Sequence, residues 1–79
     1  MLKVKLRHYV LDIDKVYTIL TEHNIDILNS NCWRDTTTCL IEDRQTLQNI
    51  LNVLNKHTSG VSILSARPTL STLLRSIFK

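Results

Sequence analysis

The spacing of apolar residues in this 79-residue chain changes twice from every second position to every third or fourth. Alternation indicates a strand with one buried face, and the wider spacing indicates an amphipathic helix. The expected order is strand, helix, two strands, helix and strand, at residues 2–10, 12–24, 25–33, 37–42, 44–57 and 61–65. Sequential pairing with right-handed crossovers predicts an α+β, ferredoxin-like βαββαβ fold, with a four-stranded antiparallel sheet and two helices on one face.

Residues suited to capping lie at both ends of each expected helix. Asp12 and Asp43 can accept hydrogen bonds from the free N–H groups at the two helix N-termini. Asn24 follows the first helix and tolerates the left-handed conformation that often ends helices. Gly60 is the only glycine and follows the second helix, where a positive φ is often needed.

The register between the second and third strands decides which side chains face the helices. A two-residue turn at Asp35 and Thr36 is expected, and it sets that register. The residues under the helices would then be Ile25, Ile27, Trp33 and Leu40, and those on the opposite face Leu28, Cys32, Cys39 and Ile41. That opposite face would be too apolar for water, so we expect a homodimer or the C-terminal tail to cover it.

The chain is expected to divide into a domain of residues 1–66 and an amphipathic helix of residues 67–79. Pro68 suits the first turn of a helix. A helix this short is unstable alone in water, so its apolar stripe needs a surface. The residues expected to form the dimer or tail contact are Leu28, Ile41, Leu70, Leu73, Leu74, Ile77 and Phe78.

Composition narrows the class of protein. A hydrophobic fraction of 43% indicates a globular domain, and a net charge of +3 permits contact with nucleic acid without requiring it. The N-terminus has no signal-peptide pattern and nothing approaches the length of a membrane span, so we expect a cytoplasmic protein without membrane contact. Cys32 and Cys39 would face each other in the expected register, close enough to bridge, although reduced thiols are expected in the cytoplasm.

Residues 12–30 resemble the first half of an ACT domain, with an acidic loop, a helix and the strand entry Glu22-His23-Asn24-Ile25-Asp26-Ile27. The segments 38–41, 47–54 and 60–64 agree in pattern, so the resemblance spans about residues 3–66. It implies a non-enzymatic regulatory module that works as a homodimer through a protein partner or a small effector such as an amino acid. The ligand-binding residues that it implies are Leu11, Asp12, Ile13, Asp14, Asn24 and Asp26. In the other interpretation, Asp12 and Asp14 only cap the first helix, whose preceding loop has no glycine.

The first strand suggests an alternative function. Lys3, Lys5, Arg7 and Tyr9 alternate with its apolar residues, so they would face away from the helices. A basic row beside a tyrosine suits phosphate contact and base stacking in a nucleic-acid-binding module. A solvated charge row at the rim of a dimer is the other interpretation. No recognisable catalytic motif and no metal-ligand spacing is present, so we expect neither an enzyme nor a cofactor or metal.

Overall fold

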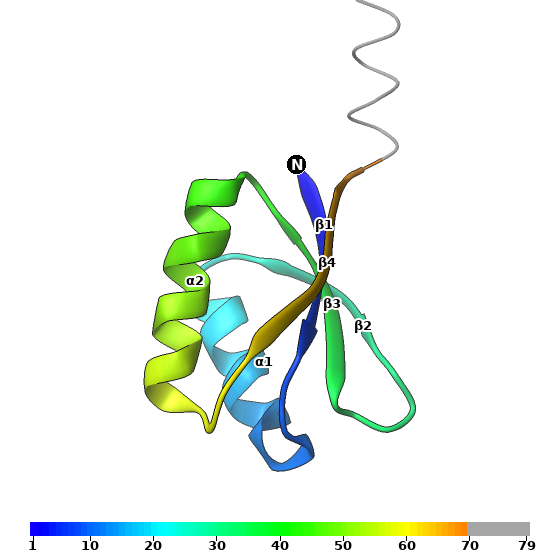
Figure 1. Cartoon of the computed structure of the whole chain (residues 1–79), viewed down its shortest axis with the longest axis vertical. Helices are drawn as coiled ribbons and strands as arrows, with labels where there is room; N and C mark the ends of the chain where they lie inside the picture. Colours follow the sequence, from blue (N-terminus) through cyan, green and yellow to red (C-terminus); the bar gives the residue numbers. More distant parts are fainter. Residues whose placement is uncertain (70–79) are drawn as a thin grey trace, which may run out of the picture.

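The computed structural model describes residues 1–69, in which two helices pack against a four-stranded antiparallel sheet. Figure 1 shows both helices on the same face of the sheet. The α+β class expected from the sequence is therefore confirmed. In chain order the elements are β1 (Leu2–Arg7), the short 3₁₀ helix η1 (Val10–Asp12), α1 (Ile13–Glu22), β2 (Asp26–Ser30), β3 (Thr36–Ile41), α2 (Arg44–His57) and β4 (Ser62–Pro68).

The strands lie side by side in the order β2-β3-β1-β4, so β1 and β3 are central and β2 and β4 form the edges. All three pairings are antiparallel. Irregularities interrupt the register between Lys5 and Leu6 where β1 meets β4, and between Ile27 and Asn29 where β2 meets β3. Such bulges bend a strand and increase its twist.

The hydrophobic core lies between the helices and the sheet. In β1 every second residue is buried, as its alternation predicted. The apolar stripes of both helices are buried against the same face of the sheet. The core residues are Leu2, Val4, Leu6, Val16, Ile19, Leu20, Ile25, Cys39, Ile41, Leu47, Ile50, Leu54 and Val61.

The expected features at the ends of the helices are mostly present. Asp43 accepts a hydrogen bond of 2.7 Å from the backbone N–H of Thr46 at the start of α2. Asn24 has a φ of 59° just after α1, and Gly60 has a φ of 145° just after α2. These three positions were predicted from local residue preferences alone.

The prediction of a two-residue turn between β2 and β3 is wrong. The connection is a five-residue loop, residues 31–35, closed by a hydrogen bond of 3.0 Å from the N–H of Asn31 to the carbonyl of Thr36. The side-chain oxygen of Asn31 also accepts hydrogen bonds from the N–H groups of Asp35 and Thr36, at 3.1 and 3.2 Å. An Asn side chain can organise a turn in this way, and here it produces a longer loop than the sequence suggested.

The longer loop reverses the faces of β3. Cys39 and Ile41 are 0% and 1% exposed and lie under the helices, whereas Leu40 is paired with Lys3 on the opposite face. A shift of one residue moves every side chain of a strand to the other face. The expectation that Ile41 contacts a dimer partner or the tail across that face is therefore wrong. The face opposite the helices is also less apolar than expected.

Trp33 and Cys32 were expected in β2, and both lie in the loop instead. Cys32 is exposed while Cys39 is buried, and both thiols are free. The two cysteines are not opposed across the strands, because Cys39 is paired with Ile27. Leu28 lies at the irregularity of β2 and remains exposed, in agreement with its expected position outside the core.

β4 continues to Pro68, so a strand occupies the first two residues of the segment in which a helix was expected. The N–H of Thr69 donates to the carbonyl of Met1 at 3.2 Å, which holds the end of β4 beside the N-terminus. Leu70, Leu73, Leu74, Ile77 and Phe78 lie outside the described residues. None of the helices within residues 1–69 is long and apolar enough to span a membrane.

Candidate functional site

The sheet surface opposite the two helices carries most of the basic side chains that the sequence singled out. We call this surface the open face. Its central residues, fixed by the strand pairing, are Lys3, Lys5 and Arg7 of β1, Thr36, Thr38 and Leu40 of β3, and Ser65 and Arg67 of β4. The predicted orientation of Lys3, Lys5 and Arg7 is confirmed, since all three are exposed and alternate with buried residues.

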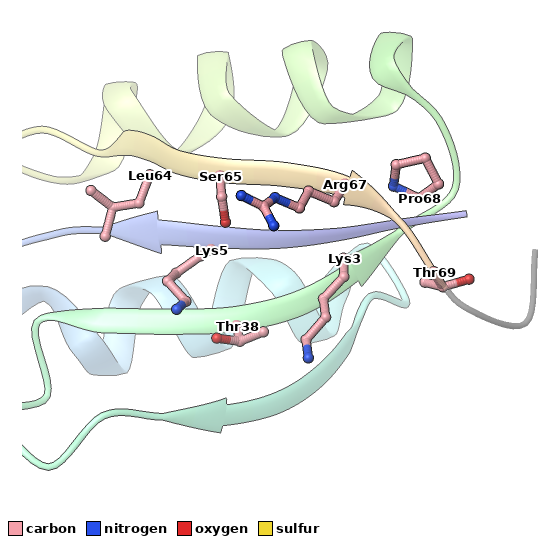
Figure 2. Close-up of a pocket in the computed structure, with 8 residues that line it drawn as sticks. All are labelled: Lys3, Lys5, Thr38, Leu64, Ser65, Arg67, Pro68 and Thr69. Atoms are coloured by element: carbon pink, nitrogen blue, oxygen red, sulfur yellow. The ribbon is translucent and has the colours of Figure 1, made fainter. Parts of the chain in front are cut away.

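A shallow hollow of about 600 Å³ lies on the open face, between β4, β1 and β3 (Figure 2). Lys3 is directly opposite Arg67 on the neighbouring strand, and Lys5 is opposite Ser65. Figure 2 shows Lys3 and Lys5 extending from β1 on the side of Thr38. The hollow is lined by Lys3, Lys5, Thr38, Leu64, Ser65, Arg67, Pro68 and Thr69.

This hollow is positively charged. No acidic residue lines it, and Lys3, Lys5 and Arg67 make no ion pair within residues 1–69. Asp26 shares the open face but lies on edge strand β2, with β3 between it and β1. Three positive charges without an acidic partner in the described part of the chain therefore line one hollow and attract anions.

Arg7 differs from the other three cations because it has an acidic neighbour. The pKa of Asp35 lies below its ordinary value, mainly because Asn31 donates a hydrogen bond to its carboxylate. The positive charge of Arg7 also contributes to this lowering. Asp35 therefore stays ionised and offsets part of the charge of Arg7, so the excess of positive charge lies over the other end of β1.

Arg67 was missed by the sequence analysis. The expected fourth strand ended at Ser65, whereas β4 extends to Pro68. The pattern that could have found Arg67 is the alternation of Ser65 and Arg67 with Ala66, which continues the strand. Tyr9, which was expected beside the lysines, lies beyond the end of β1 and precedes η1.

The residues that the ACT resemblance implied as ligand-binding do not come together in one copy of the chain. Leu11, Ile13 and Asp14 lie around the N-terminus of α1. Asn24 and Asp26 lie beyond its C-terminus, and a helix of ten residues is about 15 Å long. A site built from both groups would therefore need a second copy.

The side chain of Asp12 is buried and has a structural partner. Its Oδ2 accepts a hydrogen bond of 3.0 Å from the N–H of Ser59, in the loop that joins α2 to β4. Asp12 occupies the N-cap position of α1, as the sequence suggested, but its side chain makes no hydrogen bond to the first turn of the helix. It instead ties two loops at the same end of the sheet.

A chain of hydrogen bonds crosses the buried layer near the end of β1. His8 is buried, and its Nε2 lies 2.7 Å from Oγ1 of Thr37. Oγ1 of Thr37 lies 3.5 Å from Oγ of Ser30, which in turn contacts the hydroxyl of Tyr17. No buried polar side-chain atom among residues 1–69 lacks a partner, so this layer has the properties of a stable core.

Residues 1–69 contain no group of three or more His, Cys, Asp or Glu side chains arranged to hold a metal ion. Comparison with protein-family models, with curated proteins and with solved structures finds no significant match to this chain. The open face is therefore the candidate site on the strength of its own geometry and charge.

Proposed function

We propose that this protein is a non-enzymatic binding module of ferredoxin-like βαββαβ architecture, whose open face binds the phosphate backbone of single-stranded nucleic acid. The observation that carries this proposal is the hollow lined by Lys3, Lys5 and Arg67, which has no acidic lining residue and no ion pair to these cations among residues 1–69. Lysine and arginine contacts to phosphates release counterions, which drives binding without sequence preference.

The shape of the open face favours a single strand over a duplex. Same-face residues on one strand are about 6.6 Å apart, so Lys3, Lys5 and Arg7 form a straight row along central strand β1. An extended chain of phosphates can lie along such a row. Reading the major groove of a duplex requires a protruding helix or ribbon, and both helices lie on the opposite face.

The proposal is tested by fluorescence anisotropy with labelled oligo(dT) and oligo(U) over a range of salt concentrations. The triple variant Lys3→Gln, Lys5→Gln, Arg67→Gln should lose most of the binding. If each cation contacts one phosphate, the slope of log K against log salt should fall by about 2, since each single-strand contact contributes about 0.7.

A matched control removes the same charge from the helical face. Lys15 lies on α1, Arg44 and Lys56 lie on α2, and all three are exposed. The triple variant Lys15→Gln, Arg44→Gln, Lys56→Gln should bind oligonucleotide nearly as well as the unmodified protein. Equal losses in both triple variants would show a response to net charge alone and would refute an interface on the open face.

The second candidate function is the ACT-like regulatory homodimer, acting through a small effector or a protein partner in the cytoplasm. One observation favours it: Leu11 is 93% exposed in the connection between β1 and α1, where the resemblance places the effector loop. An apolar side chain so exposed suits contact with a second molecule.

This second candidate is tested by two measurements on the full chain. Sedimentation equilibrium should detect a dimer, and Leu11→Asp should weaken it if the exposed loop takes part. An amino-acid effector should raise the melting temperature at millimolar concentration, because a ligand that binds only the folded state stabilises it. A monomer whose melting temperature is unchanged by all twenty amino acids would exclude the amino-acid-binding homodimer.

A further inference from the structure

Two large aromatic side chains are exposed at the end of the sheet where β1 ends. Trp33 is 76% exposed in the loop between β2 and β3, and Tyr9 is 63% exposed just after β1. Tryptophan and tyrosine usually bury most of their surface in a folded domain. Their exposure here leaves two aromatic surfaces open to a ligand.

The loop that carries Trp33 is held by hydrogen bonds on both sides of that residue. Asn31 accepts hydrogen bonds from the N–H groups of Asp35 and Thr36 and donates one of 2.7 Å to the Asp35 carboxylate. The N–H of Arg34 donates to the carbonyl of Asn31 at 3.0 Å. Trp33 is therefore presented by an ordered backbone, so binding through it would cost little ordering entropy.

The backbone at Tyr9 is fixed to the same end of the sheet. The N–H of His8 donates to the carbonyl of Asp35 at 2.9 Å, which joins the end of β1 to the loop that carries Trp33. The carbonyl of Tyr9 accepts hydrogen bonds from Nδ1 of His8 and from the N–H of Asp12, at 2.9 and 3.0 Å. Both aromatic residues thus belong to one hydrogen-bonded unit.

The cationic row on β1 leads toward this unit. Lys3, Lys5 and Arg7 follow one another along the strand, and Arg7 is paired with Thr36, the residue after the loop. Beside the loop, the ionised Asp35 offsets part of the positive charge of Arg7 and Arg34, so the excess of positive charge is smaller there than around Lys3, Lys5 and Arg67. The two ends of the row therefore suit different parts of a nucleotide chain, phosphates over Lys3 and Lys5 and bases beside the loop.

We infer that Trp33, together with Tyr9, stacks on unpaired bases of the strand whose phosphates lie along β1. This inference rests on the proposed function and adds to it the requirement for bases that are free to stack. Every base has a flat aromatic surface, so stacking tolerates sequence differences. Duplexes and polymers without bases should bind only through the cations.

The test uses the fact that Trp33 is the only tryptophan in the chain, so tryptophan fluorescence reports on this residue alone. Single-stranded oligo(dT) should quench the fluorescence. Inorganic polyphosphate of similar charge, and a duplex of the same length, should leave it nearly unchanged. Unquenched fluorescence at saturating oligo(dT), with binding verified by anisotropy, would refute stacking and leave the proposed function intact.

Variants supply the second readout. Trp33→Ala should weaken oligo(dT) binding by about 5- to 150-fold, which is the range for loss of one base–aromatic stack. Trp33→Phe should recover part of this loss, and the salt slope should remain unchanged in both. Val10→Ala is the matched control, because it shortens an exposed apolar side chain at the same end that cannot stack.

The outcomes separate the two proposals. Trp33→Ala protein that binds as tightly as the unmodified protein would refute the stacking inference alone. A protein that binds no oligonucleotide at low salt would refute both proposals. An equal loss of binding in Trp33→Ala and Val10→Ala would indicate a general apolar contact at this end and would also contradict stacking.

Discussion

Nε2 of His8 and Oγ1 of Thr37 lie 2.7 Å apart in the buried layer between the sheet and the helices. Nδ1 of the same imidazole lies 2.9 Å from the carbonyl of Tyr9. A carbonyl oxygen can only accept, so Nδ1 carries a hydrogen, and in the neutral ring Nε2 accepts from the Thr37 hydroxyl. The pair thereby fixes the orientation of His8 at the point where β1 leaves the sheet.

Removing the Thr37 hydroxyl should destabilise the protein. Thr37→Val keeps the size of the side chain but leaves a buried ring nitrogen of His8 without a partner. The expected loss is about 1–3 kcal/mol in the free energy of unfolding, measured by urea denaturation. Thr38→Val is the matched control, since Thr38 lies on the other face of the same strand, where it lines the hollow and makes no side-chain hydrogen bond to another of residues 1–69. Equal losses in the two variants would contradict a specific role for the hydroxyl of Thr37.

Asp12 should contribute more to stability than Asp14, although both are acidic residues at the start of α1. Asp12→Ala leaves the N–H of Ser59 without its acceptor, and the expected cost is about 1–3 kcal/mol. Asp14→Ala should have a smaller effect because Asp14 is exposed. Thermal unfolding of the two variants side by side measures the difference in stability. A larger loss of stability in Asp14→Ala would contradict a stabilising role for the hydrogen bond between Asp12 and Ser59.

Ionisation of the Cys39 thiol should lower the stability of the folded protein at alkaline pH. Burial raises the pKa of the Cys39 thiol to about 11, above the ordinary value of about 8.5 that the unfolded chain would show. The unfolded state then releases its proton first, so the contribution of Cys39 is fully present below the lower value and is lost as pH rises toward 11. Urea midpoints between pH 8 and 11 should fall less steeply in Cys39→Val. The same slope in both proteins would refute this assignment.

Asp43 should make α2 sensitive to acid. The N–H of Thr46 donates to its carboxylate, which holds the pKa of Asp43 below its ordinary value. A lowered pKa gives stability that is present above the value of the unfolded chain, about 3.9, and is lost as pH falls through the folded value. The melting temperature of Asp43→Asn should therefore depend less on pH between 5 and 2. An unchanged acid profile would show that the cap does not contribute.

Local sequence patterns, such as alternation and capping residues, predicted the structural features that depend on only a few neighbouring residues. The burial of Leu2, Val4 and Leu6 followed from alternation along one strand. The start of α2 at Arg44 and the positive φ at Gly60 followed from the preferences of Asp43 and glycine. The exposed position of Lys3 and Lys5, two of the three cations around the hollow, followed from the same alternation.

The register between β2 and β3 did not follow from local signals. It depends on the side chain of Asn31, which closes a five-residue loop, where the sequence suggested a two-residue turn. That difference moved Cys39 and Ile41 from the expected open surface into the core and placed Trp33 in solvent. The open face is consequently less apolar than the sequence suggested, because Leu40 lies there in place of Cys39 and Ile41.

The sequence alone determined the class of fold, the ends of α2 and the basic face of β1, because periodicity and capping involve residues within a few positions of one another. Tertiary structure decided the register of β3, the pairing of Lys3 with Arg67, and the tie between Asp12 and Ser59. These relationships join residues far apart in the chain, so they depend on which strands pair and where a loop closes. The cationic hollow exists only after β1 and β4 have been brought side by side.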